Sequence, residues 1–128
     1  MVGTVKSQRP VNLDITTIKF TPQMIASITH RIAGVAIFAG MAFLIWGLGL
    51  SLQSQESFDQ LKECMDSVVA KLIIWAILAG FIYHFIAGVR HLLMDAGYFE
   101  TLEGSRVLSI AVMIVSAVLI VAAGVWVW

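Results

Sequence analysis

Two histidines and one carboxylate are spaced along the apolar segment Gly80–Asp95 so that they fall on one side of a helix. At 3.6 residues per turn, steps of three or four residues keep side chains on one face. The members of this face are Gly80, His84, Gly88, His91 and Asp95. The nearest charged residue to His84 is Arg90, about 9 Å away along a helix axis. An imidazole at that depth in an apolar helix predicts a function for His84.

We interpret His84 as an axial ligand of a haem iron. Neutral imidazole is a common iron ligand, and the missing side chains at Gly80 and Gly88 leave room for a flat porphyrin. Gly88 is therefore a candidate cofactor contact. Two alternatives stay open: a neutral histidine that is hydrogen-bonded to a neighbouring helix, and glycines that serve only close helix packing.

The second axial ligand is expected from another chain. His91 lies about 10 Å from His84 along the same helix, so it cannot bind the opposite side of the same iron. His30 is expected in the first turns of the first helix, too shallow to reach that iron. His30, Arg31 and His91 are instead predicted to lie near the haem propionates, with interfacial snorkelling as the alternative.

A second polar face on the first helix contains Ser27 and Arg31, one turn apart. A hydroxyl donor and a fixed cation can bind the carbonyl oxygens of a lipophilic ligand whose tail stays in the bilayer. A capping serine and a charge-orienting arginine form the alternative. Asp95 follows His91 by one turn and is expected either to orient it or to pair with Arg31.

The composition that must position these residues is that of a membrane protein. Of the 128 residues, 59% are hydrophobic and 12% are charged, whereas about a quarter are charged in soluble domains. Three runs lack Asp, Glu, Lys and Arg and approach the roughly 20 residues that span a bilayer: Ile32–Gln55, Leu72–Val89 and Val107–Trp128.

We therefore expect an all-α membrane protein with three transmembrane helices, at about 22–52, 67–94 and 107–128. Residues 1–128 are expected to form a single membrane-anchor domain with an extended cytoplasmic arm at 1–20 and a polar loop at 53–71. Thr21 and Pro22 are typical of a helix start. The third helix has only Ser109 and Ser116 as polar groups, which favours a lipid- or partner-facing role. The three helices are expected to form half of a haem-binding bundle that a partner subunit completes.

Basic residues orient the predicted helices. Lys62 and Lys71 lie on one side of the membrane, and on the other lie Lys6, Arg9, Lys19, Arg31, Arg90 and Arg106. Because cytoplasmic segments carry the excess of Lys and Arg, the N-terminus is predicted in the cytoplasm and the C-terminus outside. The first 20 residues have neither a secretory signal nor a transit-peptide pattern, so a bacterial inner membrane is expected.

The charge and cysteine counts exclude other classes. The net charge is zero, which suggests no nucleic-acid partner. Cys64 is the one cysteine, so no disulfide within the chain and no covalent haem attachment are expected.

Three motifs resemble a known family. Ser27–Gly34 reads S-I-T-H-R-I-A-G and resembles the S-x-x-H-R-x-[ST]-G signature of the cytochrome b subunits of succinate dehydrogenase. His84–Asp95 is similar to that family's H-x-x-x-G-x-R-H-L-x-x-D, and Arg9–Leu13 to its R-P-x-x-L. This chain departs at Ala33, where the family usually has Ser or Thr.

The resemblance implies a membrane anchor of complex II that is not catalytic alone. Its partners would be a flavoprotein subunit, an iron–sulfur subunit and a second small membrane subunit, in membrane lipid and with a higher oligomer open. Haem b would be shared with that second subunit, and ubiquinone would be the substrate. By motif position, His84 would be the axial ligand, Ser27 and Arg31 would line the quinone site, and His30, Arg31 and His91 would lie near the propionates. The alternatives are a fumarate reductase anchor, and a haem-free structural anchor or small transporter.

Overall fold

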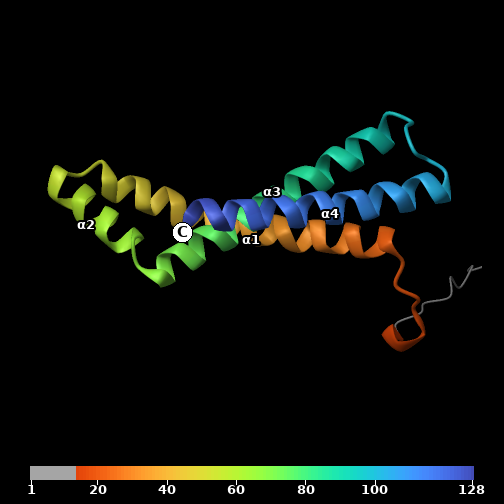
Figure 1. Ribbon diagram of the computed structural model, residues 1–128, viewed down its shortest axis with the longest axis horizontal. Coiled ribbons are helices and arrows are strands. Elements are labelled where there is room, and N and C mark those ends of the chain that lie inside the picture. The colour runs from red at the N-terminus through yellow and green to blue at the C-terminus, as the bar shows by residue number, and fades with distance from the viewer. Residues whose placement is uncertain (1–13) are drawn as a thin grey trace, which may run out of the picture.

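The computed structural model describes residues 14–128, which fold into helices joined by short connections. The elements are the 3-10 turn η1 (Ile15–Thr17) and the helices α1 (Pro22–Ser51), α2 (Gln55–Met65), α3 (Val68–Asp95) and α4 (Leu102–Val127). The helices α1, α3 and α4 run along the long axis of the molecule, and α2 lies at the end far from the start of α1 (Figure 1). These three long helices have the length and apolar composition to cross a membrane. The predicted all-α architecture with three membrane-spanning helices is therefore confirmed.

Hydroxyl side chains begin each α-helix. Each helix is preceded by a residue with extended backbone angles whose hydroxyl accepts a hydrogen bond from a backbone N–H of the first turn. These residues are Thr21 before α1, Ser54 before α2, Ser67 before α3 and Thr101 before α4. Such capping satisfies one of the donors that a helix start leaves unpaired. The predicted helix start at Thr21 and Pro22 is confirmed, with the Met24 N–H donating to the Thr21 hydroxyl over 3.3 Å.

Two connections differ from the sequence-based expectations. The segment 53–71 is not a loop, because Ser54 and Ser67 cap two helices within it and α2 lies between them. The helix α4 begins at Leu102, ahead of the expected start at 107, because Thr101 caps a polar first turn before the apolar run. Of the expected arm at 1–20, only residues 14–20 are described, and these include η1.

A tight turn reverses the chain between α3 and α4. The N–H groups of Gly97 and Tyr98 donate over 3.0 Å to the carbonyls of Met94 and Leu93, a pattern that closes many helices. Gly97 has a φ of +85°, a conformation that costs glycine little and other residues more. The turn places the end of α3 and the start of α4 at the same end of the bundle as the start of α1 (Figure 1).

The helix α4 packs on α3 through small polar residues. Its buried residues recur at helical spacing and are Ser105, Ser109, Val112 and Ser116. At the other end of the interface, the Trp75 indole N–H donates over 2.9 Å to the carbonyl of Ile120. Small residues allow membrane helices to approach closely. Ser109 and Ser116, the two polar groups noted in the predicted third helix, are thus buried within the bundle.

Most of the apolar surface stays exposed. In the most apolar 18-residue stretch of each span, only a small share of the residues is buried: 11% in α1, 6% in α3 and 11% in α4. In a bilayer such surface faces lipid or other membrane helices, so packing within the chain leaves room for further partners.

Candidate histidine site

The histidine side chains of α1 and α3 meet at one place. The rings of His30 and His84 stack with centroids 4.0 Å apart and an interplanar angle of 14°. The ring of His91 lies 5.1 Å from that of His30 and is tilted by 49°. The site is therefore a three-histidine cluster that joins α1 to α3.

The cluster corrects the expected depth of His30. The sequence placed His30 in the first turns of α1, well short of His84, yet the two rings are in stacking contact. The position of a residue in the sequence gives its depth in the membrane only along its own helix. The relative shift of α1 against α3, which the packing sets, brings the two residues to one level.

Three glycines lie where α1 and α3 meet, and of these only Gly34 leaves too little room for an ordinary Cβ contact. A Cβ atom on Gly34 would lie 3.1 Å from Cε1 of His84, and one on Gly88 would lie 3.7 Å from Nε2 of His30. At Gly80 a Cβ would meet Ile37 at 3.6 Å. The interpretation of Gly80 and Gly88 as open gaps beside His84 is corrected, because α1 fills the space next to both.

A hydrogen bond fixes the tautomer of His84. Its Nδ1 lies 3.0 Å from the backbone carbonyl oxygen of His30. Because that oxygen can only accept, Nδ1 carries the proton and Nε2 presents a lone pair. Histidines that bind metals commonly donate their other ring N–H to a backbone carbonyl, which orients the ring and strengthens it as a ligand. The residues present therefore fit a haem iron held by His84 Nε2.

His30 and His91 are not arranged to bind the same metal ion as His84. Among residues 14–128 no group of three or more His, Cys, Asp or Glu side chains is arranged to hold a metal ion. The His30 Nε2 atom is buried and has no hydrogen-bond partner within those residues. A stacked pair of rings does not converge on one metal, so the geometry favours a single axial ligand over a chelate.

Tyr83 anchors the same interface and was missed by the sequence-based prediction. Its hydroxyl lies 2.5 Å from Oγ1 of Thr29 and donates over 3.4 Å to the carbonyl of Ala26. These contacts fix α3 against α1 one residue before His84. A tyrosine within the apolar helix was the available signal, since a buried phenol usually has a hydrogen-bond partner.

The sequence-based prediction used Arg90 only as a nearby charge and to orient the helices, and it missed the contacts that Arg90 makes within the bundle. It is only 4% exposed, and its Nη2 donates over 3.2 Å to the Ser105 hydroxyl of α4. Its Nε has no hydrogen-bond partner in the part of the chain that the structure describes. The regular spacing of Ser105, Ser109 and Ser116 was the signal for a buried polar stripe on α4, and its first member, Ser105, meets this arginine.

The predicted quinone residues lie beside the cluster. Ser27 is half-buried one turn before His30, and Arg31 is exposed in the next position along α1. Asp95 is exposed, and no hydrogen bond or ion pair joins it to His91 or Arg31 within residues 14–128. Neither expected partnership of Asp95 is present.

These features define a class of protein: a multi-pass helical membrane protein with a histidine cluster at the junction of two spans. Comparison with known families identifies the class further. Residues 5–123 match the family model described as the succinate dehydrogenase/fumarate reductase transmembrane subunit. The chain belongs to this family, as the motifs in its sequence indicated.

Similar proteins cover between 69% and 97% of the chain. The succinate dehydrogenase cytochrome b556 subunit of Coxiella burnetii is 39% identical over 125 residues, which cover 97% of this chain and 100% of that protein. The cytochrome b556 subunit of Paracoccus denitrificans is 33% identical over 94% of this chain and 93% of its own length. The cytochrome b560 subunit of Porphyra purpurea is 34% identical over 69% of this chain and 72% of its own.

Proposed function

We propose that this chain is the membrane-anchoring cytochrome b subunit of a succinate dehydrogenase, and that it binds haem b and forms part of a ubiquinone-reduction site. The observation that carries the proposal is the hydrogen bond between His84 Nδ1 and the His30 carbonyl. It leaves the second ring nitrogen of His84 as a ligand within an apolar helix, where an ionisable side chain is otherwise costly. The names of the relatives, which are cytochrome b subunits, support a haem protein.

His84 would hold the haem iron through Nε2. A haem bound there supplies a one-electron carrier at membrane depth. The His30 carbonyl fixes the ring orientation of His84, and the His30 imidazole covers one of its faces. Arg31 and His91 lie near His30 and would serve the propionates as a cation and a hydrogen-bond donor. Gly88 faces the His30 ring, whose Nε2 would lie 3.7 Å from a Cβ at this position.

A second small membrane subunit would supply the other axial ligand. The stacked rings of His30 and His84 do not converge on one ion, and His84 is the one whose Nδ1 is oriented by a backbone carbonyl. The exposed apolar surface of the spans is suited to helices of such a subunit. A flavoprotein and an iron–sulfur subunit would complete the enzyme, in which this chain would not be catalytic alone.

The quinone head group would bind beside Ser27 and Arg31. The Ser27 hydroxyl makes no hydrogen bond within residues 14–128, so it is free to donate to a quinone carbonyl. The Arg31 guanidinium would stabilise negative charge that develops on the same oxygen, because it does not lose its proton. The head group would then lie at the end of the bundle that holds the histidine cluster, with its tail in lipid.

The membrane would be a bacterial inner membrane, with the N-terminus cytoplasmic. The excess of Lys and Arg at the end of the bundle that holds the histidine cluster supports this orientation. Among the alternatives, the family description includes fumarate reductase, but the relatives described above carry succinate dehydrogenase names.

Replacement of His84 tests the proposal. In the purified complex, His84→Leu is expected to remove or strongly perturb one b-type haem, measured by a reduced-minus-oxidised optical spectrum and haem content. His91→Leu is the control on the same helix, and it should keep the haem with an altered midpoint potential. If the complex with His84→Leu assembles and keeps an unchanged spectrum and midpoint potential, the assignment of the ligand is wrong.

A further inference from the structure

Two adjacent residues of α3, Tyr83 and His84, make all the hydrogen bonds that join α1 to α3 in the part of the chain that the structure describes. The Tyr83 hydroxyl lies 2.5 Å from Oγ1 of Thr29 and 3.4 Å from the carbonyl oxygen of Ala26. The His84 Nδ1 lies 3.0 Å from the carbonyl oxygen of His30. Because Ala26 and His30 are four residues apart, their carbonyls are separated by about 6 Å along α1.

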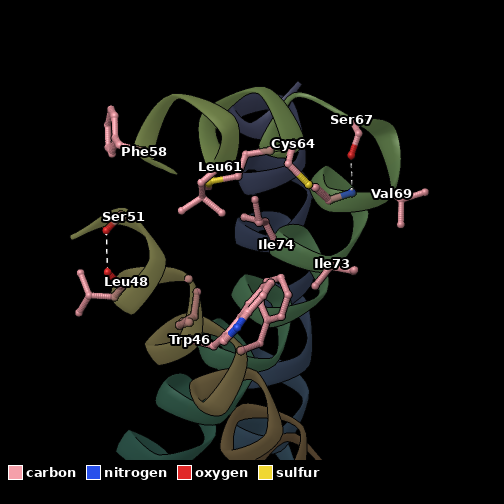
Figure 2. Close-up of a pocket in the computed structure, with 15 residues that line it drawn as sticks. Trp46, Leu48, Ser51, Phe58, Leu61, Cys64, Ser67, Val69, Ile73 and Ile74 are labelled. Atoms are coloured by element: carbon pink, nitrogen blue, oxygen red, sulfur yellow. Dashed lines mark hydrogen bonds between the residues drawn. The ribbon is translucent and has the colours of Figure 1, made fainter. Parts of the chain in front are cut away.

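The rest of this interface gives no direction to the packing. Ile37 of α1 faces Gly80 of α3 in an apolar contact. At the far end of the bundle, α1, α2 and α3 line a largely apolar cavity (Figure 2). The two hydrogen bonds drawn in Figure 2 lie within a helix or between a helix and its cap, so neither joins α1 to α3. Because apolar contacts are non-directional, the hydrogen bonds of Tyr83 and His84 decide how the two helices are turned toward each other.

The ring of His84 depends on both attachments to α1. It stacks on the His30 imidazole with an interplanar angle of 14°, so His30 defines the plane of this ring as well as the partner of its Nδ1. A single hydrogen bond lets α3 pivot about the bonded atoms, whereas a second one, a turn away, holds the rotation of α3 against α1. A pivot would tilt the ring and lengthen a bond that is about 0.2 Å short of the usual upper limit.

The Thr29 hydroxyl is placed to receive the second attachment. It donates over 2.6 Å to the carbonyl oxygen of Ile25, one turn earlier in α1. Its oxygen is then left to accept from the Tyr83 hydroxyl, for which the carbonyl of Ala26 is a second acceptor. Because an unpaired hydroxyl is costly in apolar surroundings, these bonds hold Tyr83 against α1 at one level.

We propose that Tyr83 and Thr29 are positioning residues for the haem ligand: their hydroxyl contact holds α1 and α3 so that the His84 ring stays in the plane set by His30. This inference rests on the proposed role of His84 as the axial ligand. Neither hydroxyl touches the iron, and each acts through the orientation of His84. Without the contact, the bond from Nδ1 weakens and His84 becomes a poorer donor to iron, which disfavours the ferric state and raises the midpoint potential.

Tyr83→Phe in the purified complex tests the proposal, because it removes the hydroxyl and keeps the ring. We expect a higher midpoint potential and altered g-values in the electron paramagnetic resonance spectrum of the ferric haem, since these values report the orientation of the axial ligand planes. Tyr98→Phe makes the same change at an exposed position and should alter neither measurement. Thr29→Val should shift both in the direction of Tyr83→Phe, whereas Thr29→Ser, which keeps the hydroxyl, should restore the unchanged values.

Combining the substitutions shows whether the two hydroxyls act through one contact. The double variant of Thr29→Val and Tyr83→Phe should match Tyr83→Phe alone, because the second change finds no bond left to break. Additive shifts, unchanged values in Tyr83→Phe, or an equal shift in Tyr98→Phe would each overturn the positioning role.

His84→Leu in the same series separates this inference from the proposed function. If His84→Leu keeps an unchanged haem spectrum, the ligand assignment fails and the positioning role fails with it. If His84→Leu loses the haem while Tyr83→Phe and Thr29→Val keep the original g-values and potential, the ligand assignment stands and only the positioning role is overturned.

Discussion

A single added methyl group at Gly34 should alter the potential of the proposed haem. In Gly34→Ala the new Cβ would lie 3.1 Å from Cε1 and 3.4 Å from Nδ1 of His84, closer than the roughly 3.5–4.0 Å of an ordinary carbon contact. The His84 ring must then move away from α1 by about 0.5 Å. Its hydrogen bond to the His30 carbonyl, now 3.0 Å, would exceed the usual upper limit of about 3.2 Å.

The loss of that bond can be expressed as a potential. A hydrogen bond of this kind contributes about 0.5–1.5 kcal/mol. For a one-electron couple, about 59 mV corresponds to a tenfold change in equilibrium, so a loss confined to one oxidation state would shift the potential by about 20–60 mV, which is the upper bound. Without its acceptor, the Nδ1–H makes the imidazole a weaker donor to iron, and the ferric state loses more stabilisation than the ferrous state. The midpoint potential should therefore rise.

Potentiometric titration of the b-type absorption band would measure the shift in the purified complex. Gly80→Ala is the matched control, because its Cβ would meet Ile37 at an ordinary 3.6 Å on the same side of α3. If Gly34→Ala and Gly80→Ala have the same midpoint potential, the reasoning is refuted. A general loss of stability is not expected, since alanine favours a helix over glycine by about 1 kcal/mol.

Other predictions concern the quinone, the orientation and the buried arginine. Ser27→Ala should lower quinone reduction by up to about 100-fold while succinate oxidation with an artificial acceptor is kept, and equal losses in both assays would indicate poor assembly instead. A reporter active only outside the cytoplasm should be active after Trp128 and silent at Gly104, and activity at Gly104 would reverse the proposed orientation. Ser105→Ala should destabilise the folded protein by about 1.5–3 kcal/mol in a detergent unfolding titration, because it leaves the buried Arg90 guanidinium without its acceptor. Arg90→Met in the same variant should restore stability, and a double variant whose two effects simply add would contradict this coupling.

The sequence by itself determined the class and the three membrane-spanning helices. Uncharged runs about as long as a bilayer is thick predict spans without reference to any contact, because lipid requires every backbone polar group to be paired within the segment. Thr21 and Pro22 marked the start of α1 for an equally local reason, the capping of its first turn. The spacing of His84, His91 and the glycines likewise puts them on one face of α3, because side chains three or four residues apart share a helix face.

Only the tertiary structure decided how these faces meet. The level of His30 against His84 depends on the relative shift of α1 and α3, which Gly34 and the Tyr83 contacts set and which no single helix records. The polarity of Arg90 is likewise met by Ser105 on another helix, across a turn in the chain. Periodicity fixes which residues share a face, because it is a property of one helix. Which face opposes which, and at what level, follows from side-chain packing between segments far apart in the sequence.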